Sequence, residues 1–201
     1  MELSFDLNNM RTMEFGIGMD DMNNQSFCLM AVDSNVQSAL REMTLATWNA
    51  MNALNSDPPM YEASEKHESQ EYVYLSLNDD LAYQMKLLHE ANNLRINSNA
   101  FEEPTNIFCY FARLTDAHGR RLTALRRATQ FKGALKSRFI AWRLMTDALK
   151  LVEYKIFRLD NDFDLLIDAS NIHILRPNAF EFVGKLQDAI LAAVPENIRM
   201  I

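Results

Sequence analysis

The sequence predicts an α+β fold, in which a mixed or antiparallel sheet is flanked by helices. Strand-like alternation and helical spacing of apolar residues both occur along the chain, without the regular β-α-β order of a doubly wound sheet. The chain has 201 residues, of which 48% are apolar and 23% are charged. A chain of this size and composition buries a core as one domain or as two small ones.

The first half begins with a predicted β-hairpin and a long helix. Two apolar stretches, Met13–Met19 and Ser26–Val32, flank a polar segment, as the two strands of a hairpin do. Asp33 or Ser34 caps a helix in which apolar residues recur at helical spacing as far as Asn55. Two consecutive prolines follow shortly afterwards, and we expect an exposed loop there.

A short strand, a second helix and a linker complete the first half. The strand is predicted over Tyr72–Leu77, and Asn78 or Asp79 then caps the helix. The polar connection Asn92–Thr105 is the best candidate for a boundary. The sequence therefore predicts an acidic α/β part over residues 1–100. It leaves open whether this part shares a sheet with the rest of the chain.

Residues 101–201 are predicted to form a basic α+β core. Its clearest feature is a hairpin of Ile107–Leu114 and Arg121–Ala128, whose connection contains turn residues. A helix is predicted over part of Phe131–Leu151. The remaining predicted elements are strands over Val152–Leu159, Phe163–Ile167 and Ile172–Leu175, followed by one helix that starts at Pro177 and ends at Pro195.

Several classes of protein are excluded by what the sequence lacks. The five glycines form neither a phosphate-binding loop nor a dinucleotide-binding turn, which argues against a nucleotide cofactor. The longest apolar runs have six residues, whereas a membrane span needs about 20. Two isolated cysteines and four scattered histidines predict a reduced, cytoplasmic protein without a structural metal site.

Charge is distributed unevenly along the chain, and this is the main functional signal. The formal net charge is −7, but residues 113–158 contain 12 basic and three acidic residues, a balance of +9. The plainer explanations for such a cluster are pairing with the acidic N-terminal part, within the fold or across a dimer, and simple solvation. Eight of the 12 are arginines, and an excess of this size also predicts a phosphate-binding face. The candidate nucleic-acid contacts are Arg113, Arg120, Arg121, Arg126, Arg127, Lys132, Lys136, Arg138 and Arg143.

Two of these candidates, Arg126 and Arg127, are neighbours on a predicted strand. Side chains of successive strand residues lie on opposite faces, so at most one of the two serves a given surface. No recognition-helix, zinc-finger or RNA-binding signature accompanies the basic residues. Phosphate contacts of this kind give salt-dependent binding with little sequence preference.

The best enzymatic alternative is a metal-dependent nuclease. Glu153 and Lys155 form the E-x-K triplet with which such enzymes hold Mg²⁺ and position water. The aspartates that could complete this site are Asp116, Asp147, Asp160 and Asp164. The segment from Asp160 begins like a calcium loop, but it lacks the glycine and the final glutamate that this geometry needs.

The second half of the chain also resembles a known family. The resemblance is carried by four segments. They are Phe111–Asp116, Ala124–Gly133, Val152–Asp168 and Ile172–Pro177 followed by Phe180 and Glu181. These segments resemble the KwaB family of the bacterial Kiwa anti-phage system, known as a domain of unknown function. The match covers roughly residues 108–195 and is a diffuse pattern without a catalytic signature.

The resemblance implies a cytoplasmic, oligomeric DNA-binding effector, with a dimer as the expected assembly. It implies a membrane protein, KwaA, as the partner, and restriction of phage replication as the outcome. Members of the family run longer after the segment that ends near Pro195, so a truncated or divergent member is expected. The sequence thus supports three hypotheses: a non-enzymatic DNA-binding subunit, a metal-dependent nuclease, and an interaction scaffold whose acidic part pairs with its basic half.

Overall fold

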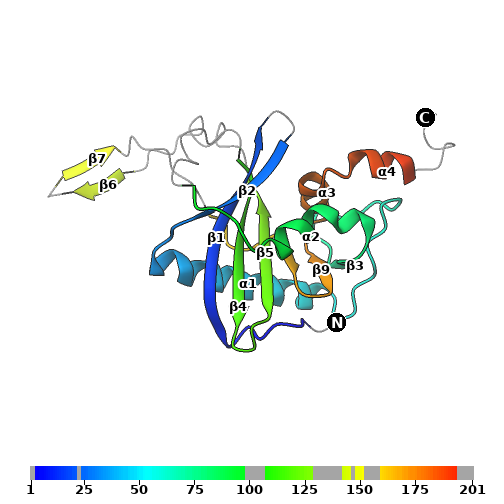
Figure 1. Cartoon of the computed structure of the whole chain (residues 1–201), viewed down its shortest axis with the longest axis horizontal. Helices are drawn as coiled ribbons and strands as arrows, with labels where there is room; N and C mark the ends of the chain where they lie inside the picture. The colour runs from blue at the N-terminus through cyan, green and yellow to red at the C-terminus, as the bar shows by residue number, and fades with distance from the viewer. Residues whose placement is uncertain are drawn as a thin grey trace.

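A seven-stranded antiparallel sheet, in the order β2-β1-β4-β5-β8-β9-β3, forms the centre of the molecule (Figure 1). The computed structural model describes residues 3–21, 24–97, 107–128, 142–145, 148–151 and 159–193. The strands of this sheet are β1 (Met10–Asp21), β2 (Asn24–Met30), β3 (Val73–Ser76), β4 (Ile107–Asp116), β5 (Arg121–Arg127), β8 (Leu165–Ile167) and β9 (Asn171–Ile174).

The predicted α+β class is therefore confirmed. Strands from both halves of the chain share the sheet: β1 pairs with β4, and β3 pairs with β9. The first half supplies both edge strands, and the second half supplies most of the centre. A division near residue 100 thus does not divide the sheet.

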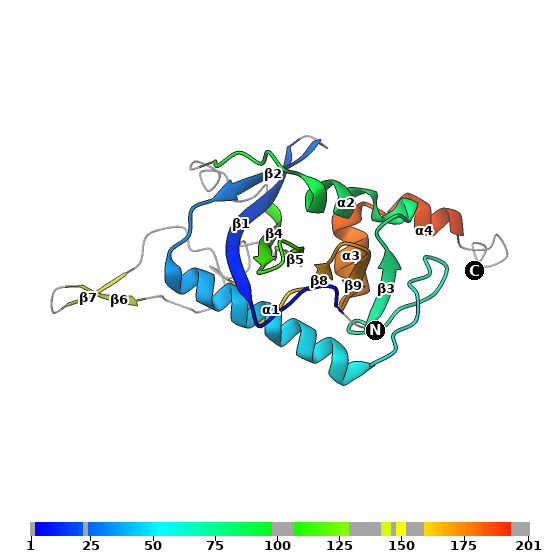
Figure 2. The same ribbon diagram turned by 60° about the horizontal axis from the view of Figure 1, so that its bottom comes forward.

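Helices cover both faces of the sheet (Figure 2). On one face, α1 (Ser34–Leu54) packs Leu40, Met43 and Met51 against strand residues such as Tyr110. On the other face, α2 (Tyr83–Glu90) and α3 (Pro177–Gly184) pack against strand residues such as Phe111. Because successive strand residues alternate between the faces, nearly every residue of β4 is buried.

Local signals place these elements much as the sequence predicts. The Asp33 carboxylate accepts a hydrogen bond from the Val36 amide at 2.9 Å and caps α1. Asp79 caps η1 (Asp80–Ala82) through the Leu81 amide, also at 2.9 Å, and η1 leads directly into α2. The predicted hairpins β1–β2 and β4–β5 are both present.

The structure refines three of the predictions. Within Phe131–Leu151, where a helix is predicted over part of the segment, the described residues are two strands, β6 (Trp142–Met145) and β7 (Ala148–Leu151), which form a two-stranded sheet. The rest of that segment lies outside the described residues. The helix that starts at Pro177 is two helices, because Lys185 adopts a left-handed conformation (φ 54°) between α3 and α4 (Gln187–Ala193). At the start of the connection predicted over Asn92–Thr105, Ile96 forms a parallel bridge with Leu29 of β2. The strand predicted over Val152–Leu159 lies almost entirely outside the described residues.

Candidate nucleic-acid interface

The structure describes the side chains of five of the nine predicted nucleic-acid contacts. Arg113 lies on β4, Arg120 in the β4–β5 turn, and Arg121, Arg126 and Arg127 on β5. For Arg143 the structure gives the backbone position, within β6. Lys132, Lys136 and Arg138 lie outside the described residues.

Arg113 and Arg121 hold the carboxyl end of α2 against the sheet. Arg121 donates to the His89 carbonyl at 2.7 Å and to the Asn92 amide oxygen at 3.1 Å. Arg113 donates to the Ala91 carbonyl and forms a 2.6 Å ion pair with Glu14, its cross-strand neighbour on β1. Guanidinium groups at this end of a helix satisfy its last carbonyls and complement its dipole. These two arginines therefore have an internal role.

The same end of α2 contains a buried histidine. The ring of His89 lies 2.9 Å from the Thr123 hydroxyl, and the residue is only 6% exposed. Burial lowers the pKa of His89 to about 4, and the positive charge of Arg121 acts in the same direction. His89 is therefore neutral at physiological pH, which suits a ring packed beside two guanidinium groups.

Arg120 closes the turn between β4 and β5. The buried carboxylate of Asp116 accepts hydrogen bonds from the backbone amides of His118 and Arg120, and from the Arg120 side chain at 2.7 Å. It also accepts the amide of Asp6 from the N-terminal segment. Burial alone would raise the pKa of Asp116, but these hydrogen bonds outweigh it and hold the pKa below its ordinary value.

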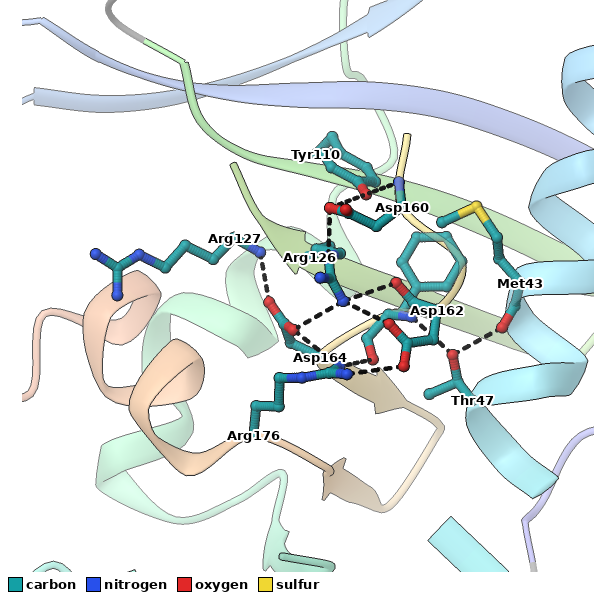
Figure 3. A network of polar contacts seen from close by, with 10 residues as sticks. Met43, Thr47, Tyr110, Arg126, Arg127, Asp160, Asp162, Asp164 and Arg176 are labelled. Carbon is teal, nitrogen blue, oxygen red and sulfur yellow. Dashed lines mark hydrogen bonds and ion pairs between the residues drawn. The ribbon is translucent and has the colours of Figure 1, made fainter. Parts of the chain in front are cut away.

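Arg126 is the centre of a network that we call the Arg–Asp clamp (Figure 3). Its guanidinium group lies 2.8 Å from the carboxylate of Asp160, 2.6 Å from that of Asp162 and 3.4 Å from that of Asp164. Arg176, just before α3, binds Asp162 at 2.7 Å and Asp164 at 3.2 Å. The clamp thus joins two guanidinium groups to three carboxylates.

The acidic turn of the clamp is also held by α1 and by β4. The hydroxyl of Thr47 on α1 accepts the amide of Phe163 at 2.7 Å and donates to the Met43 carbonyl (Figure 3). The hydroxyl of Tyr110 accepts the amide of Asp160 at 3.1 Å. Phe163 itself is fully buried, so the turn is an integral part of the core.

Burial and charge oppose each other within the clamp. Burial disfavours the charge of Arg126, but Asp164 and Asp160 outweigh it and raise the pKa of the guanidinium group. Burial raises the pKa of Asp164, although the Arg127 amide and both guanidinium groups act in the opposite direction. Arg126 is therefore occupied within the fold and is a poor phosphate contact.

Arg127 lies on the opposite face of β5, as the alternation predicts. Its guanidinium carbon lies 3.7 Å from the ring centroid of Phe182 on α3, and the side chain is exposed. Its backbone amide, but not its side chain, takes part in the clamp, through a 2.7 Å hydrogen bond to Asp164. Among the five predicted contacts with described side chains, Arg127 is the one whose guanidinium group has no hydrogen bond or ion pair with another described residue.

The alternative nuclease site is only partly described. Asp160 and Asp164 belong to the clamp, where guanidinium groups occupy the oxygens that would bind a metal ion. Asp116 is likewise held by its own turn. Asp147, Glu153 and Lys155 lie outside the described residues. Within the described part of the chain, no three His, Cys, Asp or Glu residues are grouped as metal ligands.

Sequence reasoning missed Arg176 and Asp162 of the clamp, and it missed a buried polar chain beneath α1. The hydroxyl of Tyr72 lies 2.8 Å from Nδ1 of His173, whose Nε2 lies 3.3 Å from the Asp168 carboxylate. Asp168 also accepts the amide of Ser4 at 3.0 Å. An isolated histidine on an apolar strand carries no sign of such partners, which lie far away in the sequence.

Comparisons with known proteins add no relative to this picture. No family model, curated protein or solved structure matches the chain. Over the described residues, none of the helices combines the length and the apolar character that crossing a lipid bilayer requires.

Proposed function

We propose that the protein is a non-enzymatic DNA-binding protein whose contacts lie on the β5–β8 connection (residues 128–164) and on Arg127 beside it. The charge distribution supports this proposal. Residues 127–158 contain eight basic and two acidic residues, so a positive excess remains after the four internally bound arginines are set aside. Lysine and arginine side chains neutralise phosphates and release the counterions condensed on DNA.

The resemblance to the KwaB family supports the same class of function. On this basis we propose an effector subunit of a bacterial anti-phage complex, dimeric, cytoplasmic and associated with a KwaA-like membrane protein. The acidic remainder of the chain would discourage indiscriminate binding to other polyanions. The internal ion pairs of Arg113, Arg120 and Arg126 favour a second candidate, an interaction scaffold that binds no nucleic acid.

A DNA-binding assay across a salt series decides between these candidates. We expect the wild-type protein to bind a fluorescent duplex with an affinity that falls steeply between about 50 and 200 mM salt. Replacing Lys132, Lys136 and Arg138 together by Glu should weaken binding at least tenfold. Replacing Arg11, Lys66 and Arg95, which are exposed on other elements, by Glu changes the net charge equally and serves as the control.

Other outcomes of this assay would support a different function. Absence of duplex binding even at low salt would favour the scaffold, and equal losses in both triple variants would indicate a net-charge effect without a defined interface. Cleavage of the duplex with Mg²⁺ or Mn²⁺ that Glu153→Gln abolishes would instead establish the nuclease.

A further inference from the structure

The β6–β7 hairpin separates its residues by type onto two faces. Trp142 lies opposite Leu151, and Leu144 lies opposite Leu149. Because successive strand residues alternate between faces, these four apolar residues share one face. The other face takes Arg143 opposite Lys150, together with the paired residues Met145 and Ala148. By register, one face of the ribbon therefore takes four apolar residues, and the other takes Arg143 and Lys150 beside Met145 and Ala148.

Arg143 and Lys150, two residues of like charge, occupy directly opposed register positions of the ribbon. Directly paired residues of an antiparallel ribbon have Cβ atoms about 5 Å apart, and like charges at such positions destabilise the pairing. A two-stranded hairpin is also only marginally stable by itself in water. An anionic partner on this face would turn the repulsion between Arg143 and Lys150 into shared attraction.

The hairpin also has a fixed base. Figures 1 and 2 show it well apart from the seven-stranded sheet in both views. The β5–β8 connection that contains it leaves and rejoins the sheet at one point, since β5 and β8 are paired neighbours. The Arg–Asp clamp closes this point, and the 2.7 Å hydrogen bond from the Arg127 amide to Asp164 holds the two chain ends together.

We propose that the β6–β7 hairpin is the element that enters a groove of duplex DNA, with Arg143 and Lys150 as phosphate contacts. The major groove of B-DNA admits a two-stranded β-ribbon, and ribbon readers are an established class of DNA-binding protein. This inference rests on the proposed function and adds the DNA form and the element that contacts it.

The test compares two double variants of the full chain. Replacing Arg143 and Lys150 by Gln removes two positive charges from the ribbon, and replacing Arg11 and Arg95 by Gln removes two elsewhere. We expect the ribbon variant to lose at least tenfold in duplex affinity, and its plot of log affinity against log salt to flatten by about 1.8, or 0.9 for each lost phosphate contact. The control variant should match the wild type. Circular dichroism and thermal unfolding establish that both variants are folded.

Different experimental results would contradict the ribbon assignment and the proposed DNA-binding function. If the wild type binds duplex and the ribbon variant binds equally well with the same salt slope, the ribbon assignment is wrong and DNA binding stands. If the wild type binds no duplex, both fail. Two further outcomes would overturn the groove assignment. One is tighter binding of single-stranded DNA than of duplex DNA. The other is binding to anionic lipid vesicles that the ribbon variant loses while its duplex binding is unchanged.

Discussion

Arg126 and Arg127 are adjacent in the sequence, but the two side chains have different surroundings. Arg126 contacts three carboxylates, while Arg127 stacks on an exposed ring of α3. The alternation of β5 predicts their opposite directions, but not the partners, which come from a turn that lies more than 30 positions further along the chain. The sequence therefore indicates which face of β5 each arginine side chain lies on, whereas its contacts depend on the tertiary structure.

This difference predicts unequal effects on stability. Arg126→Gln leaves Asp162 and Asp164 with Arg176 as their remaining guanidinium partner in the clamp, and it removes the guanidinium partner of Asp160. We expect the free energy of unfolding to fall by about 2–4 kcal/mol. Arg127→Gln keeps the backbone amide that binds Asp164, so a loss of less than about 1 kcal/mol is expected. Urea unfolding measures both values. A loss for Arg126→Gln as small as the one expected for Arg127→Gln would show that the side chain of Arg126 does not stabilise the fold through the clamp.

A carboxylate beneath α1 should make stability depend on pH. Burial would raise the pKa of Asp168, but hydrogen bonds from His173 and from the amides of Ser4, Ser170 and Asn171 outweigh it and lower the pKa. The unfolded chain, with a pKa near 3.9, therefore takes up a proton first as the pH falls. The stabilisation from this group is complete at neutral pH and decreases as the pH falls below about 5.

Asp168→Asn tests this dependence. We expect it to cost about 2 kcal/mol at pH 7, with the difference from wild type shrinking between about pH 5 and pH 3. Urea unfolding at several pH values provides the measurement, and Asp57→Asn, in an exposed loop, is the control. A difference that stays constant from pH 7 to pH 3 would contradict the assignment.

Secondary-structure elements with strong local signals are predictable from this sequence. The cap at Asp33 and the apolar spacing that follows place α1 almost to the residue, and turn residues place β4–β5. The sequence does not predict the break between α3 and α4 at Lys185, because the apolar spacing continues across it. Val183 and Leu186, on either side of the break, pack in the same cluster. A left-handed residue other than glycine has no such local signature.

In the β6–β7 hairpin, strand-like and helical spacing of apolar residues overlap in the sequence. Two pairs of apolar residues at alternate positions indicate two short strands, yet the longer apolar spacing around them favours a helix. For a segment this short, the two periods are difficult to separate. The charge excess of the surrounding segment, by contrast, is evident from the sequence alone.

At the scale of the whole molecule, the β5–β8 connection should be separable from the sheet. Because β5 and β8 are paired neighbours and the clamp closes their ends, we expect replacement of residues 129–158 by a short Gly-Ser linker to preserve cooperative unfolding. The free energy of unfolding should stay within about 1 kcal/mol of wild type, since closure entropy changes slowly with loop length.

Arg126→Gln is the internal control for this deletion. If the clamp is intact, Arg126→Gln should lower the free energy of unfolding by the same amount in the shortened chain as in the full chain. Urea unfolding measures both values. A shortened chain that fails to unfold cooperatively would mean that residues 129–158 contribute to the core.

The order of strands also bears on how the chain acquires its structure during synthesis. β3 pairs with β9, and Val73 lies opposite Ile174, about 100 residues later. At about 5–20 residues per second, the ribosome delivers β9 some 5–20 s after β3. During that interval the apolar residues of β3 remain unpaired and exposed, so they can bind chaperones or aggregate. The nascent chain is therefore expected to depend on chaperones until β9 has emerged.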